Sequence, residues 1–296
     1  MPEIDIGGCR LFFSVEGSAS QQVLLLSNSL GTTSALWDRQ AAAFATAFRV
    51  VRYDTRGHGR SSAPPGDYSL DELGRDALRI LDAVGADRAH ICGVSLGGMT
   101  AMWMGLHAPD RVGRLVLAST AARIGTPELW RQRIALVRGS GMASIAEAAP
   151  TRWFTTAFSR RHPDVVSTFV TTVASSSANG YAGCAAALRD ADMRADIGRL
   201  TAPVLVIVGK ADPATPPADG EFLRANIGGA RLVALDAAHL SNVEDADAFT
   251  TAALDFLTAS GNETWTTTHA TRRETPCEEK SSATLTSTPP SRTPPS

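Results

Sequence analysis

Short apolar runs alternate with helix-like segments along two stretches of the chain, and this alternation restricts the fold more than any other feature. Continuous apolar strands separated by amphipathic helices indicate a parallel sheet that is covered on both faces. The fold class that we predict is therefore α/β, with a mostly parallel central sheet flanked by helices. The expected strands are 11–15, 23–26, 49–53, 89–92, 115–118, 204–208 and 231–235.

Between the two stretches, residues 122–199 show helical patterns and no β-branched strand run. A helical block inserted into an α/β chain is typical of a cap over an active site. We therefore predict a core formed by 1–121 and 200–259, an all-helical cap at 122–199, and a disordered tail at 260–296, which is rich in Thr, Ser and Pro. The expected cap helices are 127–138, 142–156, 164–173 and 181–188.

Local signals bound the helices of the core. Ser69, followed by Glu72 three residues later, is a capping box and predicts a helix that ends before Gly85. The other core helices are expected at 37–47, 96–108, 218–226 and 245–257.

Composition argues against several partner classes. The 296 residues carry a formal net charge of −2, which gives no reason to expect nucleic acid or an anionic membrane as a partner. The N-terminal residues lack a signal-peptide pattern, and no apolar stretch approaches membrane-spanning length. We expect a cytoplasmic protein that binds neither nucleic acid nor membrane; a homo-oligomer stays open.

The cysteines and histidines predict no metal site. The four cysteines are scattered without C-x-x-C spacing, and His and Cys never gather at the spacing of metal ligands. We therefore expect neither a metal nor a cofactor.

The sequence Gly93-Val94-Ser95-Leu96-Gly97 directly follows the apolar run 89–92 and precedes a helix-compatible segment. G-x-S-x-G between a strand and a helix is the pattern of a nucleophile elbow, in which small flanking residues let the backbone turn sharply and expose the serine hydroxyl. Ser95 is thus the candidate nucleophile. The amide of Leu96, at the helix N-terminus, is a candidate donor to an oxyanion.

The loop after the strand at 23–27 is expected to supply the second oxyanion donor. The amide of Leu30 is the best candidate there. Ser29 stands beside it, where it either contacts substrate or belongs to ordinary loop chemistry.

An activated serine needs a base, and the base needs an acid that orients it. His239 follows the last expected strand, so we assign it as the general base. Asp212 follows the preceding strand and is the candidate acid, with a turn residue before Pro213 as the alternative. The other position for an acid, 119–126, contains no Asp or Glu, which favours Asp212.

Two other histidines compete less well for the role of base. His58 lies in the glycine-rich loop 56–61, and we interpret it as positioning that loop rather than as catalytic. His90 begins the elbow strand, at the opposite end from Ser95.

Ser95, Asp212 and His239, in this order and context, resemble the triad of the α/β-hydrolase family, and the similarity spans 10–258. Within the family, the chain looks most like the 3-oxoadipate enol-lactonases of aromatic catabolism. The segments that carry this likeness are 27–33 with Trp37, 92–99, and in the cap 130–133 and 152–154.

The resemblance implies a serine hydrolase of the β-ketoadipate pathway that opens 3-oxoadipate enol-lactone to 3-oxoadipate through an acyl-enzyme. Its small-molecule substrate is a lactone that bears a carboxylate, which calls for a cation near the pocket. Arg133 is the first candidate, with Arg152 and Arg123 behind it, although a solvated face explains Arg133 equally well. Trp153 is a candidate pocket wall, with ordinary cap packing as the alternative.

Other functions stay open on the same scaffold. A general carboxylesterase, a perhydrolase-like enzyme and a carbon–carbon bond hydrolase differ from a lactonase mainly in the cap. Dehalogenase and epoxide-hydrolase functions are disfavoured, because those relatives have Asp where this chain has Ser95. A non-catalytic ligand-binding protein is the second class, since such a protein can retain the triad.

Overall fold

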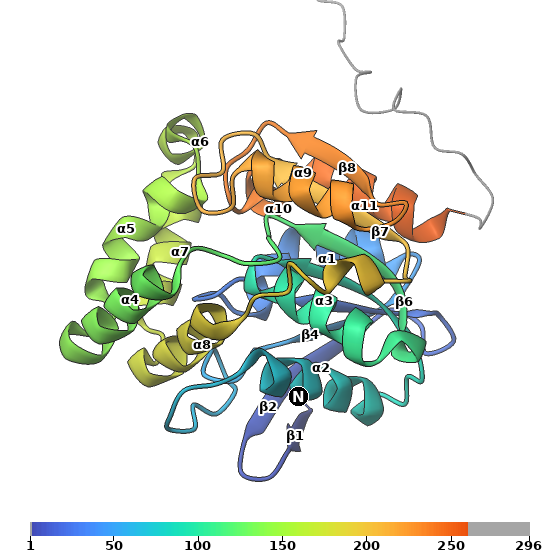
Figure 1. Ribbon diagram of the computed structural model, residues 1–296, viewed down its shortest axis with the longest axis horizontal. Helices are drawn as coiled ribbons and strands as arrows, with labels where there is room; N and C mark the ends of the chain where they lie inside the picture. Colours follow the sequence, from blue (N-terminus) through green and yellow to red (C-terminus); the bar gives the residue numbers. More distant parts are fainter. Residues whose placement is uncertain (1, 260–296) are drawn as a thin grey trace, which may run out of the picture. The chain divides into compact units, whose positions relative to one another are not determined.

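The computed structural model describes residues 2–259, so the predicted disordered tail at 260–296 lies outside the described residues. An eight-stranded sheet runs through the centre in the order β1-β2-β4-β3-β5-β6-β7-β8 (Figure 1). The pairs β1·β2 and β2·β4 are antiparallel, and the remaining pairs are parallel. The strands are β1 (Glu3–Asp5), β2 (Arg10–Glu16), β3 (Val23–Ser27), β4 (Arg49–Tyr53), β5 (Ala89–Val94), β6 (Val112–Ala118), β7 (Val204–Gly209) and β8 (Arg231–Leu235).

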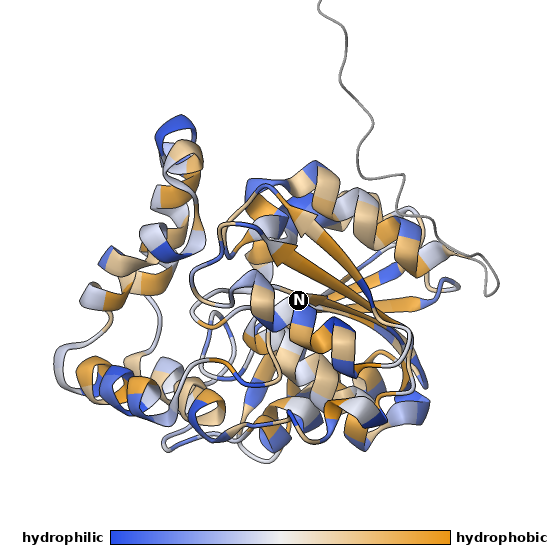
Figure 2. Cartoon of the chain, turned by 45° about the horizontal axis from the view of Figure 1, so that its top comes forward, coloured by the Kyte–Doolittle hydropathy of each residue, from blue (hydrophilic) through white to orange (hydrophobic). Residues whose placement is uncertain are grey.

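The predicted α/β architecture is confirmed: a mostly parallel central sheet is flanked by helices, with a helical insertion between β6 and β7. Both faces of the sheet are covered, which explains why β3 and β7 are buried at every position. Figure 2 shows these apolar strands between helices that carry polar residues as well. The core helices are α1 (Asp38–Ala45), α2 (Leu70–Ala83), α3 (Leu96–His107), α9 (Pro217–Asn226), α10 (Ser241–Glu244) and α11 (Ala246–Thr258), with 3-10 turns at Ser34–Trp37, Pro109–Arg111 and Ile197–Arg199.

The capping box predicted at the start of α2 is present. The Ser69 hydroxyl accepts the Glu72 amide proton at 3.2 Å, and the Glu72 carboxylate accepts the Ser69 amide proton at 2.9 Å. Two donors at the helix N-terminus are thereby satisfied.

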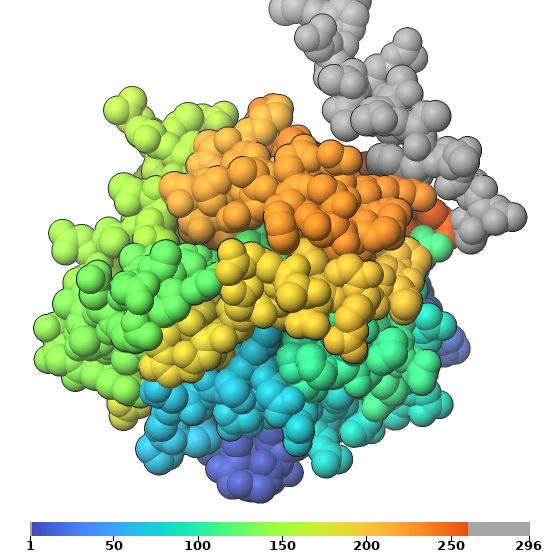
Figure 3. Space-filling view, viewed as in Figure 1, coloured from blue at the N-terminus to red at the C-terminus, as the bar shows by residue number. Residues whose placement is uncertain are grey.

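The insertion between β6 and β7 consists of helices and occupies one side of the described chain, in green and yellow in Figure 3. One of its helices was not predicted. The expected helix over 142–156 ends at Trp153, because Phe154 is extended and the Thr155 hydroxyl accepts the Phe158 amide proton at 3.1 Å to start a new helix. The inserted helices are α4 (Pro127–Ser140), α5 (Ala143–Trp153), α6 (Thr156–Arg161), α7 (Pro163–Ala174) and α8 (Ala178–Asp190).

The parallel strands end along one edge of the sheet. Their register places Ser27 beside Gly93, Val94 beside Ala118, and Gly209 beside Leu235. The loops that follow β3, β5, β7 and β8 therefore emerge at this edge, where ligands bind in open α/β sheets. Within residues 2–259, every helix falls short of the length and apolarity needed to cross a membrane.

The turn from β5 to α3 is sharp because Ser95 has φ +58° and ψ −115°. Glycine is required on both sides of this turn. A Cβ on Gly97 would collide with the Ser27 carbonyl of β3, and one on Gly93 would collide with the Gly97 carbonyl. The G-x-S-x-G spacing thus reflects close backbone contacts as well as chain flexibility.

We expect Gly97→Ala to lower the free energy of unfolding by about 3 kcal/mol, because backbone atoms of two elements must move apart. Gly139→Ala is the matched control, since its Cβ would meet open space on the exposed side of α4. That control should be neutral or stabilising by about 0.5–1 kcal/mol. Urea unfolding of both variants checks this, and equal stabilities would contradict the close-contact argument.

Candidate active site

Ser95 occupies the turn at the centre of the sheet, between the ends of β3 and β6. Its amide proton is accepted by the Ala118 carbonyl at 2.9 Å, and its own carbonyl accepts the Thr120 hydroxyl proton at 2.7 Å. A non-glycine residue at positive φ is strained, and such strain persists only where the surroundings hold it. Here the end of β6 and the residues directly after it hold Ser95 from one side, and α3 continues from its other side.

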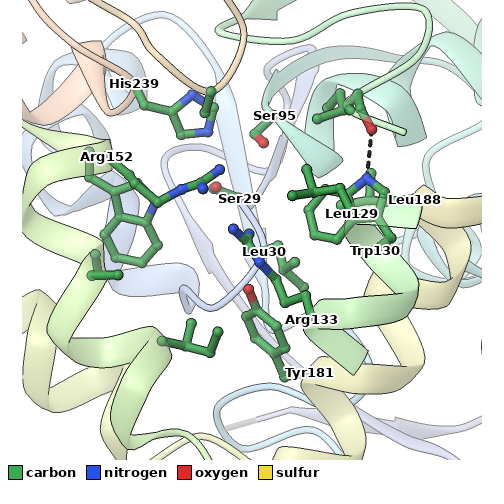
Figure 4. Close-up of a pocket in the computed structure, with 17 residues that line it drawn as sticks. Ser29, Leu30, Ser95, Leu129, Trp130, Arg133, Arg152, Tyr181, Leu188 and His239 are labelled. Atoms are coloured by element: carbon green, nitrogen blue, oxygen red, sulfur yellow. Dashed lines mark hydrogen bonds between the residues drawn. The ribbon is translucent and has the colours of Figure 1, made fainter. Parts of the chain in front are cut away.

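Asp212 and His239 come from the loops after β7 and β8 and lie against each other. His239 Nδ1 is 2.8 Å from Asp212 Oδ2, and both side chains are almost completely buried. The ionised carboxylate can only accept, so Nδ1 carries the proton and leaves Nε2 free to take one. Figure 4 shows the His239 imidazole and the Ser95 hydroxyl on the same side of one pocket.

The carboxylate of Asp212 is fully occupied by donors. Oδ1 accepts the amide protons of Ala214 at 2.7 Å and Thr215 at 3.0 Å, and Oδ2 accepts the Thr215 hydroxyl proton at 2.7 Å. Burial alone would raise the pKa of Asp212, but the positive charge of His239 when it is protonated and the hydrogen bonds from His239 and Thr215 outweigh burial and lower it. The sequence presented a turn residue and an orienting acid as alternatives for Asp212. In the structure the same carboxylate accepts the amide protons of the turn and contacts His239, so Asp212 can serve in both ways.

The loop after β3 brings Leu30 to the pocket wall and leaves its amide without a protein acceptor among residues 2–259. The Ser29 carbonyl accepts both the Thr32 amide proton, at 3.1 Å, and the Thr32 hydroxyl proton, at 2.8 Å. Because this peptide is held by its carbonyl, its N–H, which belongs to Leu30, faces the opposite way. Within residues 2–259 the Leu30 N–H has no protein acceptor. Leu96 opens α3, so its N–H has no partner inside the helix either.

A single pocket collects most of the residues that the sequence singled out. Ser29, Leu30, Ser95, Trp153 and His239 line it, together with Arg133. Trp153 is buried and stands edge-on to Phe169 at 6.1 Å between ring centroids. Asp212, which contacts His239, and Leu96, which follows Ser95 in the chain, do not line the pocket.

Two guanidinium groups reach the middle of this pocket from opposite sides (Figure 4). Arg133 stacks on Trp130, with 5.0 Å between the guanidinium carbon and the ring centroid, and it lies close enough to Tyr181 for its charge to oppose the rise in the Tyr181 pKa that burial causes. Arg152 is half-buried, and its pKa is lowered by burial and by the neighbouring charge of Arg133. Within residues 2–259 neither arginine forms a salt bridge.

The third arginine that the sequence suggested lies elsewhere. Arg123 pairs with Asp192 at 3.1 Å and does not line the pocket. Its sequence position near the end of β6 gave no indication of this partner, which follows it by 69 residues.

The sequence did not reveal how the His239 loop is tied to the insertion. The Glu244 carboxylate accepts the Ala238 amide proton at 2.9 Å and the Thr155 amide proton at 3.1 Å, and it also bonds the Thr155 hydroxyl. The Leu240 amide donates to the Trp153 carbonyl at 3.0 Å. The only sequence signal was that Glu244 is acidic and lies five positions after His239. This signal alone does not identify Ala238 or Thr155 as its partners.

Comparisons with known proteins show the family to which the chain belongs. Residues 22–246 match the family model described as alpha/beta hydrolase fold. The chain is 44% identical over 239 residues to 3-oxoadipate enol-lactonase 2 of Acinetobacter baylyi, which covers 81% of this chain and 90% of that protein. It is 38% identical over 242 residues to 3-oxoadipate enol-lactonase 1 of the same organism, and the match covers 82% of this chain and 91% of that protein. The crystal structure of the enol-lactonase from Burkholderia xenovorans LB400 has a TM-score of 0.86 at 42% identity, covering 87% of this chain and all of that chain.

We expect Asp212→Asn to lower kcat for an aryl ester by about 10⁴-fold, because the amide no longer holds the required imidazole tautomer. Since folding lowers the pKa of Asp212, its stabilising contribution is present above the unfolded value of about 4 and is lost as pH falls through the lower folded value. The stability difference between the two proteins should therefore shrink in acid.

Asp236→Asn is the matched control for this prediction. Asp236 is also acidic and close to His239 in sequence, but it is exposed and pairs with Lys210 at 2.7 Å. Steady-state rates near pH 7 and urea unfolding between pH 3 and pH 7 provide the measurements. Full activity of Asp212→Asn, or an equal loss in Asp236→Asn, would contradict the orienting role.

Proposed function

The chain belongs to the α/β-hydrolase family and is a hydrolase of the enol-lactonase type, and from that premise we propose that it opens 3-oxoadipate enol-lactone to 3-oxoadipate through an acyl-enzyme. The observation that carries the proposal is the combination in one pocket of Ser95, His239 backed by Asp212, and two arginines without salt-bridge partners among residues 2–259. The reaction would serve aromatic catabolism in the β-ketoadipate pathway.

Acylation begins when Nε2 of His239 takes the proton of Ser95 Oγ and this oxygen attacks the carbonyl carbon of the ring. The charge that develops on the carbonyl oxygen is stabilised by the N–H groups of Leu30 and Leu96. A donor of this kind contributes about 3 kcal/mol to transition-state stabilisation. Asp212 keeps Nδ1 of His239 protonated and balances the imidazolium charge.

Collapse of the tetrahedral intermediate breaks the bond between the carbonyl carbon and the ring oxygen. The leaving oxygen receives the proton from His239 and becomes an enol, which converts to the ketone. Conversion matters because the leaving group stays tethered to the acyl-enzyme and could otherwise close the ring again. Water, activated by His239, then attacks the ester of Ser95 and releases the dicarboxylate product.

The carboxylate of the substrate needs a charged partner, and Arg133 and Arg152 provide two. Guanidinium and carboxylate groups form strong, geometrically specific pairs when they are shielded from water. In this proposal the segment 122–199 acts as the cap, because α4 contributes Arg133 while α5 contributes Arg152 and the Trp153 wall. Ser29 lies at the opposite wall, where it can contact the substrate.

The direct test is loss of the enol-lactone absorbance with purified protein, followed beside hydrolysis of neutral aryl esters. We expect the lactone to be the better substrate, with the higher kcat/KM, and Ser95→Ala to abolish turnover of both. Faster turnover of the neutral esters would indicate a general carboxylesterase. Absence of any Ser95-dependent turnover would indicate a binding protein.

We expect Arg133→Ala and Arg152→Ala each to raise KM for the anionic lactone about tenfold or more, with little change for neutral 4-nitrophenyl acetate, because only the lactone offers a charge to pair. Arg131→Ala is the matched control, since Arg131 is exposed and pairs with Glu128 on the same helix. Initial-rate kinetics of the three variants on both substrates test this. Equal changes on the two substrates would exclude a carboxylate-binding role.

A further inference from the structure

His58 is a buried histidine that the proposed reaction leaves without a role. Its side chain is 2% exposed, and its Nε2 atom accepts the amide proton of Gly31 at 2.9 Å. That amide follows Leu30 directly in the chain. We infer that His58 is a positioning residue for the oxyanion hole, because it holds the peptide that follows the Leu30 donor. The inference rests on the proposed function.

The protonation state of His58 follows from its two contacts. A backbone N–H can only donate, so Nε2 must present a lone pair to Gly31. Nδ1 therefore carries the proton and lies 3.2 Å from the Arg56 carbonyl, which can accept it. Burial lowers the pKa of His58, against opposing contributions from the Arg56 carbonyl and Asp54, and so favours this neutral form.

The Arg56 carbonyl is itself held in place from several directions. The Arg56 guanidinium pairs with both oxygens of Asp76, at 2.6 and 2.7 Å, and with Glu72 at 2.7 Å. The Cys184 thiol of α8 donates to the same carbonyl at 3.4 Å. The carbonyl that accepts the His58 proton is therefore fixed by contacts with α2 of the core and with α8 of the insertion.

Two anchors then determine the orientation of the Leu30 N–H. Thr32 holds the peptide before Leu30 through the Ser29 carbonyl, and His58 holds the peptide after it through the Gly31 N–H. Oxyanion donors accelerate the reaction because they are oriented before charge develops. Without the His58 acceptor, the Gly31 N–H would be buried and unsatisfied, and the loop would relax to find another partner.

The experiment compares His58→Phe, which has no acceptor, with His58→Gln, whose side-chain oxygen can accept the Gly31 proton. With 4-nitrophenyl acetate, we expect His58→Phe to lower kcat about 10-fold to 100-fold and to leave KM nearly unchanged. This loss is smaller than the 10²-fold to 10³-fold that follows deletion of a donor, because the Leu30 N–H remains but is less well oriented. His58→Gln should retain most of the kcat. A proton-transfer role for His58 would instead abolish activity in both variants.

A second readout separates positioning from general stability. A trifluoromethyl ketone adds to Ser95 and places an oxyanion in the hole, whereas acetate mimics only a product. His58→Phe should weaken inhibition by the ketone about as much as it lowers kcat, and inhibition by acetate should stay as in the wild type. If the phenylalanine variant does not fold, the smaller His58→Leu provides the same test.

His90→Gln is the matched control. His90 is also a largely buried histidine with a pKa lowered by burial, to about 4, but it lies at the opposite end of β5 from Ser95. Its replacement should change stability and leave both kcat and ketone inhibition unaltered. The inference is overturned if His58→Phe keeps full kcat, or if the glutamine and phenylalanine variants lose kcat equally.

The substrate assignment can fail separately from this inference. A wild-type protein that hydrolyses aryl esters but not the lactone would overturn the proposed substrate and still test His58. A wild type without Ser95-dependent esterase activity would overturn both.

Discussion

The close backbone approach around Ser95 is the constraint on which the rest of the site depends. Gly97 lies so near the Ser27 carbonyl that no side chain fits between α3 and β3. This contact brings the first amide of α3 next to the loop that carries Leu30, with Ser95 between them. The proposed nucleophile and its two proposed donors thereby come from segments more than 60 residues apart in the chain.

Electrostatics in the pocket follow from how each charge is compensated. Asp212 is buried, and both of its carboxylate oxygens accept hydrogen bonds. Oδ1 accepts from the amides of Ala214 and Thr215, and Oδ2 accepts from the Thr215 hydroxyl and from His239 Nδ1. These donors stabilise the negative charge inside the fold. The charges of Arg133 and Arg152 are not balanced in this way within residues 2–259, and they also repel each other. Unbalanced cations are costly to bury, and an anionic ligand would relieve that cost. The proposed carboxylate-bearing substrate supplies such an anion.

The order of strands and helices was predictable because apolar residues recur at a regular local spacing in both kinds of element. The G-x-S-x-G turn and the capping box at Ser69 were also predictable, since each depends on neighbouring residues. β1 was not, because three residues carry almost no periodic signal and pair only through β2. The break at Phe154 was missed because its cause is a single hydroxyl at Thr155, and threonine also occurs inside helices, as Thr151 does in α5.

The site shows the same division between local and distant causes. The positions of Ser95 after β5, Asp212 after β7 and His239 after β8 could be inferred, because parallel strands end at one edge. The contacts of Glu244 and His58 could not, since each depends on a partner that is distant in sequence. Glu244 contacts Thr155, 89 residues away, and His58 contacts Gly31, 27 residues away.

The amino-acid sequence by itself determined the α/β class, the turn that exposes Ser95 and the order of Ser95, Asp212 and His239 along the chain, because periodicity and glycine spacing act locally. The tertiary structure alone decided which arginines share the pocket, how the insertion is joined to the His239 loop and what orients the Leu30 amide. These depend on packing between segments, and no local pattern encodes which distant side chain will meet a given backbone group.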